Sequence, residues 1–195
     1  GPLGATGGDG VHVDYGFGTG DILINTFNNF DAFTNPNGHA GTIDAGDDGI
    51  EVNRLGGDGL IQVFLGANVH ADDNGVNVFR GADSGNTAID VGLEYGGGEK
   101  PMSITADNGN GINVVNLLTH GSPVPAVAET MVVVHEGSSV TAKNGSAIAI
   151  VSTSLGLFGN HDVYVENHGT LTGDGGLLSP TVGVATDDGF FATNA

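Results

Sequence analysis

Cysteine and tryptophan are absent from the sequence, and basic residues number only four. The lack of cysteine suits a chain that crosses an oxidising compartment unfolded, where disulfide bonds would obstruct its passage. The four basic residues face 23 acidic ones, so the formal net charge is −19 at pH 7. A chain of this charge is repelled by nucleic acid and by anionic membrane surfaces, and we expect neither as a partner.

Long hydrophobic runs are also missing from the sequence. No run approaches the roughly 20 apolar residues that a membrane-spanning helix needs, and no signal peptide is visible. We therefore expect no direct membrane insertion of this chain. The first four residues, Gly-Pro-Leu-Gly, resemble the remnant of a cleaved expression tag. We expect residues 5–195 to form one domain, taken from a longer protein.

Glycine, by contrast, is abundant, with 36 residues, and 38% of the chain is hydrophobic. That hydrophobic content argues against wholesale disorder. Glycine, asparagine and aspartate favour turns, so the composition predicts short strands separated by turns rather than helices.

Ten triplets share one pattern, in which two β-branched aliphatic residues flank a middle residue. They begin at Val11, Ile22, Ile50, Ile61, Val76, Ile89, Ile112, Val132, Ile148 and Val163. Alternation with a period of two places the flanking residues on one face of a strand and the middle residue on the other. Six of the middle residues carry charged, amide or imidazole groups. The triplets therefore predict half-buried strands whose outer face is mostly exposed to solvent.

A longer period links these strands. Equivalent aliphatic positions lie 26, 35, 36 and 31 residues apart, at Ile43, Val69, Ile104, Val140 and Leu171. Periods in this range are typical of solenoids, and short strands joined by Gly/Asn corners can fill one period. The sequence predicts an all-β parallel β-helix of about six coils. At roughly 4.8 Å per coil its length is on the order of 30 Å.

Loop insertions lengthen two of the periods, at residues 24–43 and 91–104. The first insertion contains Phe27, Phe30 and Phe33. Exposed aromatic side chains are favoured anchors in binding surfaces, so these three residues are candidate binding residues. The alternative is that they cap or plug the core.

A family resemblance emerges in residues 163–176, which read Val-Tyr-Val-Glu-Asn-His-Gly-Thr-Leu-Thr-Gly-Asp-Gly-Gly, and in residues 139–150. This phrase resembles the repeat of bacterial autotransporter passenger domains. The resemblance implies a right-handed β-helix and type V secretion to the bacterial cell surface, with outer-membrane anchoring in the full-length protein. It specifies the architecture better than the ligand.

Calcium is the ligand that the corners favour, because it takes oxygen from carboxylates, amides and backbone carbonyls. Two acidic pairs beside glycine corners, Asp47-Asp48 and Asp72-Asp73, are the candidate metal ligands. Paired acids next to glycine are also ordinary turn residues. The sequence requires no cofactor, with calcium as the one candidate.

Two functions remain open. The first is a structural and adhesive segment that attaches to host or bacterial surface proteins or glycans through loops on a β-helical stalk. The alternative is a pectinase-like hydrolase or lyase, which would need a groove lined by acids from neighbouring coils. A lyase needs basic residues to hold an acidic sugar or to act as the base, and the chain has only four. The sequence therefore favours a non-enzymatic function.

Overall fold

The computed structural model describes residues 3–5, 7–26, 41–83, 85–93, 100–118, 127–154, 160–173, 181–186 and 190–194. The candidate binding residues Phe27, Phe30 and Phe33 lie outside these ranges. All regular elements in the described ranges are β-strands. They form three parallel sheets of six strands, and each coil contributes one strand to each sheet.

We call the three faces sheets A, B and C. Sheet A contains β1 (Leu3–Ala5), β4 (Thr42–Ala45), β7 (Asn68–Ala71), β10 (Ser103–Ala106), β13 (Ser139–Ala142) and β16 (Thr170–Gly173). Sheet B contains β2 (Val11–Phe17), β5 (Ile50–Gly57), β8 (Val76–Asp83), β11 (Ile112–Leu118), β14 (Ile148–Ser154) and β17 (Val182–Thr186). Sheet C contains β3 (Ile22–Asn25), β6 (Ile61–Leu65), β9 (Thr87–Val91), β12 (Val127–Val134), β15 (Asn160–Asn167) and β18 (Phe190–Asn194).

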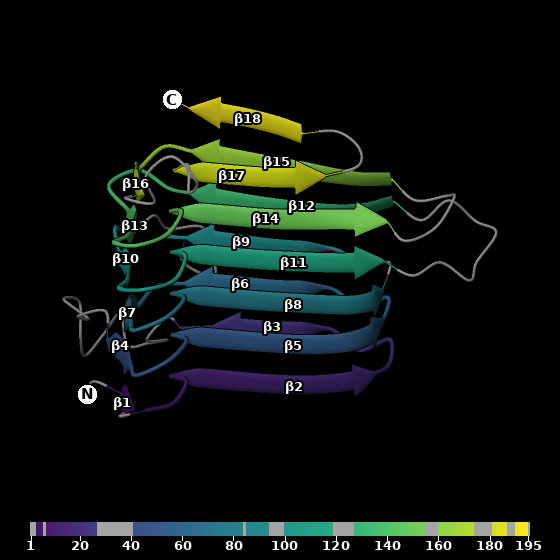
Figure 1. Ribbon diagram of the computed structural model, residues 1–195, viewed down its shortest axis with the longest axis horizontal. Coiled ribbons are helices and arrows are strands. Elements are labelled where there is room, and N and C mark those ends of the chain that lie inside the picture. Colours follow the sequence, from purple (N-terminus) through teal and green to yellow (C-terminus); the bar gives the residue numbers. More distant parts are fainter. Residues whose placement is uncertain are drawn as a thin grey trace, which may run out of the picture.

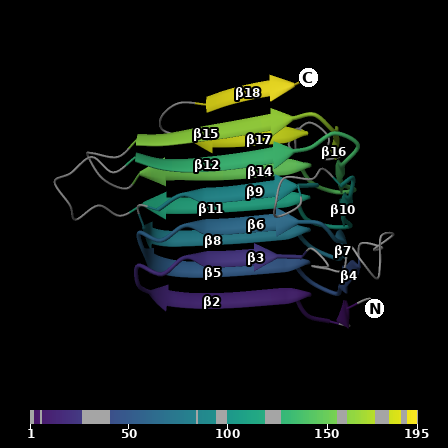
Figure 2. The ribbon, with the colours of Figure 1, turned by 180° about the vertical axis from the view of Figure 1, so that it is seen from behind.

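The chain runs along sheet B, returns along sheet C and crosses sheet A before it begins the next coil (Figure 1). The view from behind shows the same path reversed (Figure 2). The winding is right-handed, with the N-terminal coil at one end of the rod and the C-terminal coil at the other. A right-handed parallel β-helix of six coils is therefore confirmed.

The strand register also agrees with the sequence period. Ile43 pairs with Val69, Val69 with Ile104, Ile104 with Val140, and Val140 with Leu171. The sequence period predicts these five positions to be equivalent, and the pairing confirms it. All ten triplets lie in strands of sheets B and C. The register holds although the period varies, because the additional residues fall in the sequence between strands, at 26–41 and 92–102.

The core fills the centre of the rod with aliphatic side chains from all three sheets. Ile104 of sheet A, Ile50 of sheet B and Ile61 of sheet C are fully buried. The middle residues of the triplets are less exposed to solvent than the sequence predicts. Of the six polar ones, Asp90 is buried and four are half-buried, namely Glu51, Gln62, Asn77 and Asn113, since side chains of successive coils stack at about 4.8 Å and cover one another.

A ladder of polar side chains runs along the corner that precedes sheet B. In each step a side-chain oxygen accepts the backbone N–H of the equivalent residue in the next coil, at 3.2 Å in the first step and 2.9 Å in the others. The ladder consists of Asp9, Asp48, Asn74, Asn110 and Ser146. Side chains thus pair the backbone N–H groups of a corner that has no strand pairing, which holds the coils together there.

A column of glycines follows this ladder, at Gly10, Gly49, Gly75 and Gly111. A Cβ added at Gly75 would lie 2.6 Å from the carbonyl oxygen of Gly111 and 2.2 Å from a methyl carbon of Ile104. Both neighbours belong to the next coil. The close approach of the coils therefore excludes side chains at this position.

We expect Gly75→Ala to lower the free energy of unfolding by about 3 kcal/mol, because backbone of the next coil must move to admit the methyl group. The control is Gly16→Ala, where an added Cβ has nothing within 4 Å. Urea denaturation measures both changes. Equal stabilities of the two variants would contradict the observed packing of the corner.

Two arginines occupy inward positions of sheet B. Arg54 and Arg80 pair in register and are fully buried. Arg54 donates to the carbonyl oxygens of Gly20 at 2.9 Å and Gly18 at 2.6 Å, and its guanidinium lies 5.0 Å from the ring centroid of Tyr15. Arg80 donates to the carbonyl oxygens of Gly59 at 2.7 Å and Asn86 at 2.9 Å.

The buried arginines stabilise the corner between sheets B and C, because they bind backbone carbonyls that have left the sheet. Their burial also changes the electrostatics of the rod. Of the four basic residues, Lys100 and Lys143 are the two that are not buried. The surface is correspondingly more acidic than the composition alone indicates.

Candidate functional site

A groove of about 680 Å³ lies on the outward face of sheet C. It is lined by residues of β9, β12 and β15 and of the corners that follow β12 and β15. The lining residues are Asp90, Met131, Val133, His135, Glu136, Glu166 and His168. Three carboxyl groups and two imidazoles from successive coils therefore face one space.

The polar groups of the groove form two pairs. The Nε2 atom of His168 lies 2.6 Å from a carboxylate oxygen of Glu166, and the Nε2 atom of His135 lies 3.6 Å from a carboxylate oxygen of Asp90. Burial raises the pKa of Asp90, and His135 opposes that change only in part. The groove thus has groups that can donate and accept hydrogen bonds.

An apolar column adjoins this groove on the same sheet face, and Met131 belongs to both. Met131, Tyr164 and Phe191 stand in register in β12, β15 and β18. The rings of Tyr164 and Phe191 are stacked, with centroids 5.0 Å apart and an interplanar angle of 12°. Met131 is 40% exposed and Phe191 is 53% exposed. Sheet C therefore presents apolar surface next to polar groups.

The predicted metal ligands are only partly brought together. Ligand atoms of Asp47, Asp48 and Asp73 lie within 4.8 Å of one another, but Asp72 is outside this group. Asp48 is buried and already accepts hydrogen bonds from the backbone and side-chain N–H groups of Asn74 and from the side chain of Asn77. Asp48 is thus a structural residue of the corner ladder. Asp47 and Asp73 are the exposed members of the group.

Calcium binding at this group remains a prediction with a clear electrostatic basis. Partial burial and the charges of Asp48 and Asp47 raise the pKa of Asp73, so its charged form is disfavoured in the folded state. A bound cation would relieve this repulsion. We expect millimolar calcium to raise the melting temperature of the chain and Asp73→Asn to reduce that response. A shift reproduced by sodium chloride at equal ionic strength would mean screening alone.

Another histidine links coils on the outward face of sheet A. The Nδ1 atom of His70 lies 2.8 Å from a carboxylate oxygen of Asp44, and its Nε2 atom lies 3.3 Å from one of Asp107. Lys143 lies 2.7 Å from the same oxygen of Asp107. Asp44 and then Asp107 raise the pKa of His70, whereas Lys143 and His70 lower the pKa of Asp107.

These shifts set a pH window for the stability that His70 contributes. The raised pKa of His70 gives stability that is fully present below its ordinary value of 6.5 and is lost as the pH rises through the folded value. The lowered pKa of Asp107 gives stability that is present above its ordinary value of 3.8 and is lost as the pH falls through the folded value. The contribution of His70 is therefore largest between about pH 4 and 6.

We expect His70→Gln to lower the free energy of unfolding by about 0.5 kcal/mol near pH 5, after allowance for solvent screening of exposed charges. The difference from the unmodified chain is expected to shrink steadily at alkaline pH. Urea denaturation at a series of pH values measures it. A difference that does not depend on pH would contradict a charged role for His70.

A fourth histidine, His12, belongs to the first coil. Hydrogen bonds that the His12 ring donates to the carboxylates of Asp14 and Asp9 raise the pKa of His12 to about 9, against a smaller opposing effect of burial. The spacing of histidines in the sequence did not reveal this cluster. Glu51, which also contacts His12, is 39 residues away and becomes a neighbour only through strand pairing.

Comparisons of the chain with protein-family models, with curated proteins and with solved structures find no match. Among the residues that the structure describes, no helix has the length and apolar character needed to cross a membrane.

Proposed function

We propose that the chain is a structural and adhesive segment of a secreted bacterial surface protein, and that sheet C is its contact face. The autotransporter-like repeat supports the surface location. The single observation that carries the adhesive role is the apolar column of Met131, Tyr164 and Phe191 beside the polar groove. The β-helix supplies a rigid scaffold that holds both features in register.

A glycan is the partner that this face fits best. Aromatic rings pack against the apolar faces of sugar rings, and carboxylates and imidazoles exchange hydrogen bonds with hydroxyl groups. The ring of Phe191, which is 53% exposed and stacks on Tyr164, supplies the first contact, and Glu166 with His168 supplies the second. Neutral glycans are favoured because the acidic surface repels anionic ones.

Binding of the chain to an array of neutral oligosaccharides tests this proposal. We expect Phe191→Ala to weaken binding at least tenfold, because it removes half of the stacked pair. The control is Leu23→Ala, since Leu23 is 54% exposed on the first coil of the same outward face. Equal binding by the two variants, or no binding by the unmodified chain, would contradict the proposal.

The groove also supports a polysaccharide-degrading enzyme as a second candidate function. Asp90 and Glu166 pair with the same residue, Val133, from opposite sides, so two strand spacings of about 4.8 Å separate their backbones. Their backbones are thus about 9.6 Å apart, at the upper end of the roughly 6.5–9.5 Å carboxyl separation of inverting glycosidases, in which the acid of raised pKa is the proton donor. Asp90 fits that role because burial raises its pKa.

Incubation with polygalacturonate and with neutral glucans distinguishes the two functions. Hydrolysis that is lost in both Asp90→Asn and Glu166→Gln would establish the enzyme. Binding without turnover would leave the adhesive function as the explanation of the groove.

A further inference from the structure

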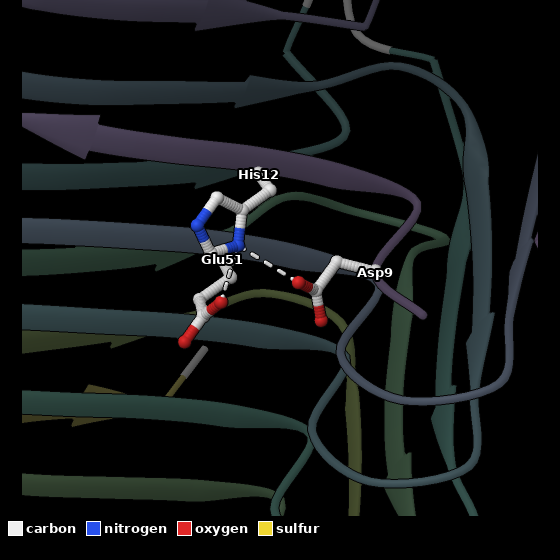
Figure 3. Close-up of side chains that lie close together, drawn as sticks. All are labelled: Asp9, His12 and Glu51. Carbon is white, nitrogen blue, oxygen red and sulfur yellow. Dashed lines mark hydrogen bonds and ion pairs between the residues drawn. The ribbon is translucent and has the colours of Figure 1, made fainter. Parts of the chain in front are cut away.

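A cluster of metal-ligating groups lies on the outward face of sheet B, remote from the groove of sheet C. His12 in β2 pairs in register with Glu51 in β5, and Asp9 precedes β2 in the corner ladder. The Nδ1 atom of His12 lies 2.8 Å from Asp9 Oδ2 and 2.5 Å from Glu51 Oε2. Figure 3 shows both carboxylates converging on this ring nitrogen from different coils.

This convergence is poorly explained by ion pairing alone. A ring nitrogen carries at most one proton, so two carboxylates on the same nitrogen share a single donor. Their negative charges also repel each other at close range. A divalent cation between the three groups would bind the nitrogen and both oxygens at once and would neutralise the two carboxylates.

The surrounding groups hold the cluster in a ligating arrangement. Asp14 Oδ2 lies 3.0 Å from His12 Nε2, and the side chain of Asn53 donates to Asp14 Oδ1 at 3.3 Å. The backbone N–H of Asp48 donates to Asp9 Oδ1 at 3.2 Å, which leaves Asp9 Oδ2 directed at His12. A carboxylate on the second nitrogen of a ligating histidine fixes the orientation of the ring and is typical of metal sites.

The geometry needs little adjustment to admit an ion. The three ligand atoms lie within 4.8 Å of one another. Zinc bonds of about 2.0–2.2 Å require tetrahedral ligands roughly 3.3–3.6 Å apart, so the contacts need to open by about 1 Å. The His12 side chain is 43% exposed, which leaves solvent room to complete the coordination.

We propose that Asp9, His12 and Glu51 form a binding site for a divalent transition-metal ion of the zinc type. One imidazole nitrogen and two carboxylate oxygens suit borderline ions such as Zn²⁺ or Co²⁺. Calcium and magnesium prefer ligand sets made of oxygen. The site would fasten the first coil to the second, because Asp9 and His12 belong to one and Glu51 to the other.

Calorimetric titration of the whole chain with Zn²⁺, in excess calcium to occupy oxygen-only sites, tests this proposal. We expect one equivalent of Zn²⁺ to bind, and His12→Gln and Glu51→Gln each to weaken binding at least tenfold. His70→Gln is the matched control. The two carboxylates of His70 lie on opposite ring nitrogens and cannot converge on one ion.

Cobalt provides a second readout that does not depend on stability. Co²⁺ bound by His12 is expected to give visible absorption bands that disappear in His12→Gln and persist in His70→Gln. Equal Zn²⁺ affinity of the unmodified chain and His12→Gln would overturn the proposal, as would equal losses in His12→Gln and His70→Gln. Circular dichroism at neutral pH confirms that each variant is folded, so that a loss of binding is not a loss of structure.

Discussion

Val134→Asp is expected to lower the free energy of unfolding by about 4 kcal/mol or more. Val134 is fully buried in β12, where it pairs with Val91 of β9 and Asn167 of β15. A carboxylate there has no room for water, and burying it without a partner costs several kcal/mol. Because small domains have only about 5–15 kcal/mol of stability, much of the rod is expected to unfold.

Val151→Asp is the matched control for this substitution. Val151 lies in β14 and is 38% exposed, so the same carboxylate remains in water. We expect a change of less than about 1 kcal/mol. Urea denaturation followed by circular dichroism measures both variants. If both lost the same stability, the assignment of inward and outward positions would be wrong.

Arg80→Ala is expected to lower the free energy of unfolding by about 3 kcal/mol. The substitution removes a fully buried side chain and leaves a cavity. It also removes the N–H groups that bind the carbonyl oxygens of Gly59 and Asn86. Buried acceptors without donors are costly, so the corner between sheets B and C is expected to loosen.

Lys143→Ala separates this effect from the loss of a positive charge. Both substitutions make the net charge more negative by one, but Lys143 is exposed and pairs with Asp107 at the surface. We expect Lys143→Ala to cost less than about 1 kcal/mol. If both variants lost similar free energies of unfolding, repulsion among the acidic side chains, rather than burial of Arg80, would control the stability.

The fold was predictable because its signals are local and repeated. Alternation within each triplet fixes the inward face, and the intervals between Ile43, Val69, Ile104 and Val140 fix the register. The same alternation could have revealed the buried arginines. Arg54 is two residues beyond Val52 and Arg80 is two residues beyond Val78, so both occupy inward positions.

The candidate sites were less predictable because each combines residues from different coils. Insertions vary the interval between coils, so no fixed spacing connects His12 with Glu51 or Asp90 with Glu166. The acidic pairs of the corners were visible in the sequence, but their roles were not. Asp48 belongs to the corner ladder and Asp72 lies outside the acidic group, because the coils align Asp48 with Asn74 and Asp47 with Asp73, so the two acidic pairs are offset by one residue.

Disulfide formation between introduced cysteines tests the in-register stacking of coils most directly, since the chain has no cysteine of its own. Thr105 in β10 pairs with Thr141 in β13, which pairs with Thr172 in β16. Adjacent strands lie about 4.8 Å apart, within the Cα range of disulfides, whereas two spacings exceed that range. We predict rapid oxidation of the Thr105→Cys, Thr141→Cys variant and none within the monomer for Thr105→Cys, Thr172→Cys. Oxidation of the second pair, or failure of the first, would contradict the β-helix register.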